Sequence, residues 1–157
     1  MKRMTLLDVQ HLYPFKQPLS LYTMGISGKP EAREQKAFVA CLMAEFPEEL
    51  GHDESLNIYS RLIVATSDFY DTGKYKGRKM QTYKKMGYQP GTPDITILYP
   101  AQDFHGFIAE MKSEIGRPTT QQNVTLQQLQ DKGYYTICAK GFAQALFHWL
   151  FYLGYTH

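Results

Sequence analysis

Three stretches of the chain have the residue pattern of an α-helix. In residues 31–46, apolar side chains recur every three or four positions, and a proline borders the stretch at each end. Residues 120–132 follow Thr119, which forms a capping-box pattern with Gln122 three positions later. Residues 142–153 are strongly apolar. The pattern therefore predicts three helices, the last of them packed into a core.

Four further stretches are rich in Ile, Val, Leu and aromatic residues, which favour β-strands. They cover residues 56–66, 94–99, 106–112 and 134–139. The elements then follow the order helix, strand, strand, strand, helix, strand, helix. This order predicts an α/β domain over residues 31–157, with an αβββαβ core and a mixed central sheet flanked by helices.

The remaining composition adds few constraints. Residues 1–30 are irregular in pattern and rich in Pro and Gly, so they are predicted to be an N-terminal extension whose role the sequence does not indicate. The chain of 157 residues is 43% hydrophobic and 14% aromatic, which suits one folded domain. It has neither a membrane-length apolar run nor a signal-peptide core. Cys41 and Cys138 form no CxxC pair, so we expect free thiols in the reducing cytoplasm.

Charged residues interrupt two of the predicted apolar strands. Asp94 begins one strand, and Glu110 and Lys112 end the next. A turn at residues 102–103 would place Asp94 opposite Met111, within one residue of register. Because side chains alternate along a strand, Glu110 and Lys112 share one face. The two carboxylates and the ammonium group are thus expected at one end of one hairpin.

Two carboxylates are poor neighbours unless a cation binds between them. Oxygen ligands of this kind suit Mg²⁺ or Mn²⁺, which would polarise a phosphodiester and activate water for in-line attack, with Lys112 assisting. Gln122 is expected to face this site from its helix, and Glu31 offers a third carboxylate. The alternative interpretation is structural, since Pro-Asp is a common turn dipeptide and Glu-x-Lys a common pair on exposed strands.

A basic segment precedes the hairpin. Between positions 74 and 85 there are six basic residues, two interleaved tyrosines and no acid. Such a segment suits a phosphate backbone, although a solvated helix over residues 78–86 would have the same composition. The predicted DNA-binding residues are Lys74, Lys76, Arg78, Lys79, Lys84 and Lys85.

Several motifs in a fixed order resemble the VRR-NUC (virus-type replication-repair nuclease) branch of the PD-(D/E)xK superfamily, and together they cover residues 31–153. They are Glu-Ala-Arg-Glu-Gln at 31–35, Gly-Tyr-Gln-Pro-Gly-Thr-Pro-Asp-Ile-Thr-Ile at 87–97, Phe-Ile-Ala-Glu-Met-Lys at 107–112, Gly-Arg-Pro-Thr-Thr-Gln-Gln at 116–122, Leu129, Gly133-Tyr134, Lys-Gly-Phe-Ala-Gln-Ala at 140–145 and Tyr152-Leu153. The resemblance implies a restriction-endonuclease-like fold. It also implies a metal site formed by three carboxylates and one main-chain carbonyl, those of Glu31, Asp94, Glu110 and Met111.

By the same resemblance, Lys112 would be the catalytic lysine and Gln122 the helix glutamine beside it. Glu34 competes with Glu31 for the first-helix ligand position, and the spacing from Glu31 to Gln35 favours Glu31. The chain also departs from the family after the first strand. It has a longer loop there in place of the frequent Asn-Gly stretch.

The function expected from this resemblance is a Mg²⁺- or Mn²⁺-dependent DNA endonuclease. The chain resembles phage and bacterial stand-alone proteins that act as dimers on four-way (Holliday) junctions. A cytoplasmic homodimer that acts on branched DNA is therefore expected. A non-catalytic nucleic-acid-binding module and a sequence-specific restriction-type endonuclease are the alternatives. The first has no need of buried carboxylates near phosphate, and the second would need a separate recognition domain.

Overall fold

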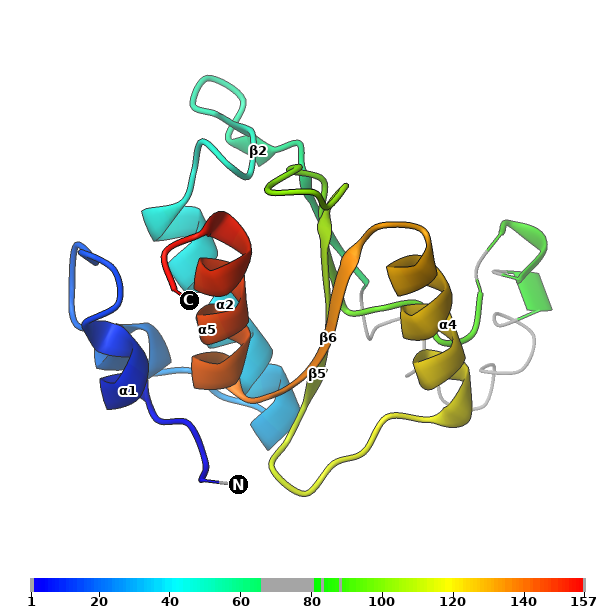
Figure 1. The fold of residues 1–157 in the computed structure, drawn as a ribbon, viewed down its shortest axis with the longest axis horizontal. Helices are drawn as coiled ribbons and strands as arrows, with labels where there is room; N and C mark the ends of the chain where they lie inside the picture. Colours follow the sequence, from blue (N-terminus) through cyan, green and yellow to red (C-terminus); the bar gives the residue numbers. More distant parts are fainter. Residues whose placement is uncertain (1, 66–80, 83, 88, 157) are drawn as a thin grey trace.

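The computed structural model describes residues 2–65, 81–82, 84–87 and 89–156. A central sheet separates α2 and α5, with α1 beside them, from α4 on its other side (Figure 1). The helical elements of known bounds are α1 (Leu6–Gln10), the 3-10 helix η1 (Leu19–Thr23), α2 (Pro30–Glu45), α4 (Thr120–Asp131) and α5 (Phe142–Leu153). The strands are β1 (His52–Asp53), β2 (Ile58–Tyr59), β3 (Leu62–Val64), β4 (Ile95–Ile97), β5 (Phe107–Lys112) and β6 (Tyr135–Lys140).

The central sheet has the order β3-β4-β5-β6. β3 and β5 both run antiparallel to β4, whereas β6 runs parallel to β5. The chain crosses from β5 to β6 through α4, as a parallel pair requires. The predicted α/β class with a mixed sheet and flanking helices is confirmed.

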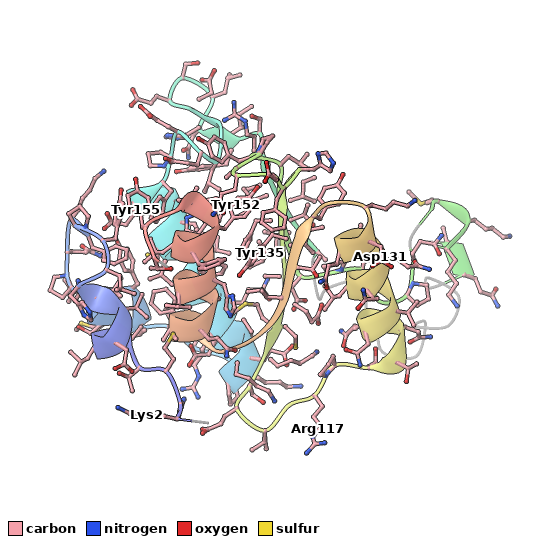
Figure 2. The ribbon with its side chains drawn as sticks, in the orientation of Figure 1. Lys2, Arg117, Asp131, Tyr135, Tyr152 and Tyr155 are labelled. Atoms are coloured by element: carbon pink, nitrogen blue, oxygen red, sulfur yellow. The ribbon has the colours of Figure 1, made fainter. Side chains whose placement is uncertain are left out.

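The main core lies between the sheet and the pair α2 and α5. Phe107 stacks on Tyr135, with 5.7 Å between ring centroids, and Trp149 meets Phe107 edge-on at 5.2 Å. Figure 2 shows Tyr135 and Tyr152 in the space between β6 and α5, where their rings lie 5.7 Å apart. Each of these rings removes a large apolar area from water and so anchors the layer.

The N-terminal thirty residues are more regular than their Pro and Gly content predicted. The side chain of Thr5 accepts a hydrogen bond from the N–H of Asp8, and Asp8 accepts one from the N–H of Thr5, so a capping box starts α1. Val9, Leu19 and Tyr22 are buried and belong to the same core as α2 and α5. A Thr-x-x-Asp pattern was the available sequence signal for this helix.

Residues 56–66, predicted to hold a strand, contain two short strands. β2 pairs with β1 in a separate two-stranded sheet, and only β3 joins the central sheet. The break occurs because the chain changes partner at Arg61. The N–H groups of Ser60 and Arg61 still donate to the carbonyls of Gly51 and Leu50, whereas the carbonyl of Arg61 accepts from the N–H of Leu98, next to β4. The other predicted strands and the three helices agree with the structure to within a few residues at each end.

Within the described ranges, no helix has the length and apolar character needed to cross a lipid bilayer.

Candidate active site

The site lies where β4 begins and β5 ends. Ile95 pairs with Ala109, so the same register continued by one residue sets Asp94 opposite Glu110. The predicted partner was Met111, one residue away, within the stated range of register. Directly opposite residues of an antiparallel pair project to the same face, so the two carboxylates face the same way.

Asp94 is fixed by the main chain of the neighbouring strand. Its Oδ2 accepts a hydrogen bond of 2.7 Å from the N–H of Met111. The preceding turn packs closely on α4, because a Cβ on Gly91 would lie 2.9 Å from the main chain of Gln121. Gly91 also has φ +82°, which favours glycine. The turn at Gly91, strand β5 and helix α4 thus jointly fix the position of Asp94.

Glu110 is the most buried charged group of the site, with 1% of its surface exposed. Its Oε1 accepts a hydrogen bond of 2.6 Å from Nε2 of Gln122 and lies 3.1 Å from Nζ of Lys112. Its Oε2 is buried and has no hydrogen-bond partner among the described residues. An unpartnered buried carboxylate oxygen is costly, so it marks a position where a ligand would be stabilised.

The electrostatics of the site follow from this burial. Burial, and then the charge of Asp94, raise the pKa of Glu110 to about 7, and the hydrogen bond and charge of Lys112 only partly oppose the rise. Burial lowers the pKa of Lys112, but its contacts with Glu110 and the charges of Glu31 and Asp94 outweigh this and raise the pKa overall. Lys112 is therefore held as a cation, and Glu110 is poised between its two protonation states near neutral pH.

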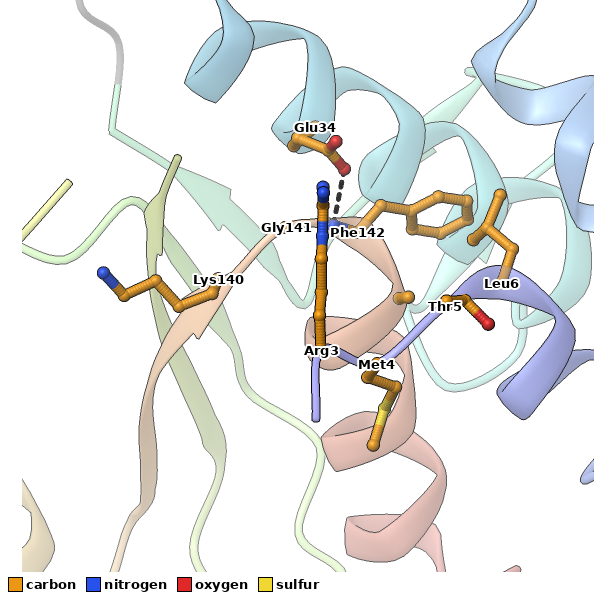
Figure 3. Close-up of a pocket in the computed structure, with 9 residues that line it drawn as sticks. Arg3, Met4, Thr5, Leu6, Glu34, Lys140, Gly141 and Phe142 are labelled. Atoms are coloured by element: carbon orange, nitrogen blue, oxygen red, sulfur yellow. Dashed lines mark hydrogen bonds between the residues drawn. The ribbon is translucent and has the colours of Figure 1, made fainter. Parts of the chain in front are cut away.

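The two candidate glutamates of α2 have different positions. Glu31 Oε1 lies 3.9 Å from Nζ of Lys112, at the edge of the site. Glu34 instead accepts a 2.6 Å hydrogen bond from the N–H of Phe142 and so caps α5, as the dashed line in Figure 3 shows. The geometry therefore favours Glu31 as the site residue of this helix.

Glu34 also lines a pocket of about 280 Å³ next to the N-terminal segment. Arg3 and Lys140 also line this pocket, and the ammonium of Lys140 points away from it (Figure 3). Arg3 is already paired with Glu114 at 2.9 Å, and the ammonium of Lys140 donates to the carbonyls of Glu114 and Gly116. These contacts hold the loop that leads from β5 to α4.

Sequence reasoning missed this role of Lys140. Lys140 is the register partner of Lys112 across the parallel β5–β6 pair. Had β5 and β6 been predicted to pair in parallel, Lys140 would have been expected beside Lys112, because partners in a ladder lie side by side.

A hard divalent cation fits the donor set of Asp94, Glu110 and Glu31, which offers carboxylate oxygens, one of them buried and unpartnered. Among the described residues, however, no three His, Cys, Asp or Glu side chains are arranged to hold a metal ion as they stand. Lys112 contacts both Glu31 and Glu110, so it occupies part of the space between them. Metal binding would require a small movement of the lysine ammonium.

Only part of the predicted DNA-binding segment can be placed. Lys84 and Lys85 are exposed, and the described positions 81, 82, 84 and 85 are helical, in agreement with the short helix predicted over residues 78–86. The other four predicted contacts lie outside the described residues. They are Lys74, Lys76, Arg78 and Lys79.

Comparison with known proteins bears on the fold. No protein-family model matches the sequence, and no curated protein matches it. A solved structure described as a VRR_NUC domain protein matches with a TM-score of 0.61 and 18% sequence identity, over 82% of this chain and 91% of that one. The chain therefore shares the fold of a VRR_NUC domain protein along most of both lengths, in agreement with the resemblance found in the motifs.

Proposed function

We propose that this protein is a divalent-metal-dependent nuclease that hydrolyses DNA phosphodiester bonds. The observation that carries the proposal is the pair formed by buried Glu110 and half-buried Asp94, with Lys112 on the same face and one Glu110 oxygen without a partner among the described residues. A structural ion pair would satisfy both oxygens of a buried carboxylate, because burial without a partner is costly. The shared fold with a VRR_NUC domain protein supports the same reading.

The residues proposed to hold the metal are Asp94, Glu110 and Glu31, with the main-chain carbonyl of Met111. A bound Mg²⁺ or Mn²⁺ would supply Lewis acidity toward the phosphate and the attacking water. Asp94 is suited to its role because the N–H of Met111 fixes the orientation of its carboxylate.

Lys112 is proposed to stabilise the negative charge that develops on the phosphate in the transition state. Lys112 is 8% exposed, and its ammonium lies beside two carboxylates, so it remains charged. Gln122 is proposed to hold Glu110 in place through its 2.6 Å hydrogen bond. Gln122 is therefore arranged before the substrate arrives, whereas the ammonium of Lys112 moves when the metal binds.

The proposed substrate is branched DNA, such as a four-way junction, cut by a homodimer. One small domain carries one such site, and a two-fold dimer would present two sites to two strands. The exposed Lys84 and Lys85 would contribute contacts to the phosphate backbone. A particle that stays monomeric in light scattering with junction DNA present would contradict the dimer.

The test is cleavage of a labelled four-way junction and a linear duplex of the same sequence, with Mg²⁺, with Mn²⁺ and with a chelator. Wild type is compared with Asp94→Ala and Lys112→Ala, each checked for folding by circular dichroism. We expect metal-dependent cutting, faster on the junction, and a loss on the order of 10³-fold in both variants.

The other outcomes separate the alternatives. Equal cutting of both substrates at defined sequences would indicate a restriction-type endonuclease. Tight binding without cutting in either metal, unchanged by both substitutions, would indicate a non-catalytic binding module and reject the proposal.

A further inference from the structure

The carboxamide of Gln122 connects the N-terminal cap of α4 to the candidate site. Its Oε1 accepts a 2.8 Å hydrogen bond from the N–H of Thr119, while its Nε2 donates to Oε1 of Glu110 at 2.6 Å. The hydroxyl of Thr119 in turn accepts a 3.2 Å hydrogen bond from the N–H of Gln122. One side chain therefore belongs both to a helix cap and to the group that surrounds Glu110.

The two ends of the carboxamide specify the same orientation. A glutamine amide can rotate by half a turn with almost no change in shape, which exchanges its oxygen and its nitrogen. After such a rotation, the NH₂ group would meet the N–H of Thr119, and the oxygen would meet the carboxylate of Glu110. Both contacts would be repulsive, so the cap keeps the NH₂ group on Glu110.

This orientation decides which oxygen of Glu110 stays open. Nε2 of Gln122 and Nζ of Lys112 both contact Oε1, at 2.6 and 3.1 Å. Oε2 is buried and has no hydrogen-bond partner among the described residues. A carboxylate held by two donors at one oxygen is restrained in rotation, and its second oxygen keeps a fixed direction.

We propose that the α4 cap is a positioning device of the site. The N–H of Thr119 fixes the carboxamide of Gln122, and the hydroxyl of Thr119 holds the main chain of the cap so that this N–H stays directed at Gln122 and Oε2 of Glu110 is presented to a divalent cation. Thr119 touches neither substrate nor cation and acts through Gln122 alone. The part of the proposal that concerns the cation rests on the proposed metal-dependent function. The part that concerns the carboxamide does not.

The chain contains a matched control for this cap. Thr5 and Asp8 form a second capping box, at the start of α1, with the same pattern of two reciprocal hydrogen bonds. That box contacts neither Glu110 nor Gln122 through any hydrogen bond found in the described residues. Thr5→Ala therefore removes a cap of the same type without reaching the site, and both losses are small beside the stability of a domain.

The experiment measures the side-chain NH₂ signals of Gln122 by ¹⁵N NMR and the binding of Mn²⁺ alone by calorimetry. Wild type is compared with Thr119→Ala, Thr119→Ser and Thr5→Ala on the full-length chain. Gln122→Glu identifies the signals by their disappearance. We expect a downfield, slowly exchanging Gln122 amide proton in wild type, in Thr119→Ser and in Thr5→Ala.

In Thr119→Ala we expect faster exchange of that proton and Mn²⁺ affinity weaker by about tenfold, since residues behind a metal ligand have effects of this order. Exchange and affinity that match those of Thr5→Ala would overturn the proposal. A faster-exchanging amide in Thr119→Ala, with no Mn²⁺ binding by wild type, would uphold the positioning by Thr119 and reject the metal-dependent function. If the exchange of the Gln122 amide proton is unchanged in Thr119→Ala and wild type cleaves DNA, the positioning by Thr119 is rejected and the metal-dependent function is upheld.

Discussion

Both faces of β5 are buried, but they differ in chemistry toward the end of the strand. Phe107, Ala109 and Met111 are fully buried against α2 and α5, in a layer of apolar and aromatic side chains. The face toward α4 begins with the apolar Ile108 and ends with Glu110 and Lys112, at 1% and 8% exposure. The end of the strand thus alternates between residues that stabilise the fold and residues whose burial opposes it.

The difference shows how a small domain keeps a charged site in order. The apolar face contributes favourable transfer of surface from water, about 25 cal/mol for each Å² of apolar area. The charged face needs hydrogen bonds to limit its cost, and one Glu110 oxygen still has no partner among the described residues. Because the strand is anchored on its other face, the charged residues stay in position without stabilising it themselves.

The largest effect that would sharpen this contrast is expected from Asp94→Asn. The substitution removes a charge but keeps an oxygen that accepts the N–H of Met111. We expect cleavage to fall on the order of 10³-fold, while the free energy of unfolding changes by less than about 1 kcal/mol. Junction cleavage and urea denaturation measure the two quantities.

Phe107→Leu is the reciprocal control. It should lower the free energy of unfolding by about 1–2 kcal/mol and leave the cleavage rate per folded molecule unchanged. A loss of cleavage rate in Phe107→Leu, or a retained rate in Asp94→Asn, would show that stability and catalysis are not separated between the two faces of β5.

A smaller effect is expected from the protonation of Glu110. Its pKa is raised from an ordinary value of 4.5 to about 7. Between these pH values the folded state keeps a proton that the unfolded state has released, so the free energy of unfolding falls as pH rises. Glu110→Gln lacks this loss, and its stability relative to wild type should rise by up to about 3 kcal/mol across the interval.

Urea denaturation from pH 4.5 to 8, with a chelator present, measures this difference. Parallel stability profiles for wild type and Glu110→Gln would mean that the carboxyl group has the same pKa in the folded and unfolded states.

The smallest effect is the stabilisation by the cation itself. A ligand that binds only the folded state at ten times its dissociation constant stabilises it by about 1.4 kcal/mol. We expect Mg²⁺ or Mn²⁺ to raise the melting temperature of wild type at pH 8 and to have a much smaller effect on Glu110→Gln. An equal rise in both proteins would place the bound cation elsewhere.

Local patterns in the sequence predicted much of the fold and the site. The capping box of Thr119 and Gln122 is present, because its hydrogen bonds depend only on residues three positions apart. The hairpin register was predicted to within one residue, since the chain turns at residues 102–103, between the bridged Ala101 and Phe104, as predicted. The metal, the DNA contacts and the dimer stay predictions.

Other features depended on contacts that are distant in sequence. The separate β1–β2 pair arises because the chain folds back between these strands and changes partner at Arg61, which no alternation of apolar residues indicates. The choice between Glu31 and Glu34 depends on α5, whose first N–H binds Glu34. Spacing within α2 favoured one residue but contained no information on the second helix.

The hydrogen bond between Glu34 and Phe142 also bears on how the protein folds. It joins residues 108 positions apart, so it forms only after most of the chain has been ordered. The β4–β5 hairpin, by contrast, has local contacts and can form early. A chain still emerging from the ribosome would therefore possess Asp94 and Glu110 before α2 and α5 close around the core, and the full charged cluster would be assembled only after α5 has been synthesised.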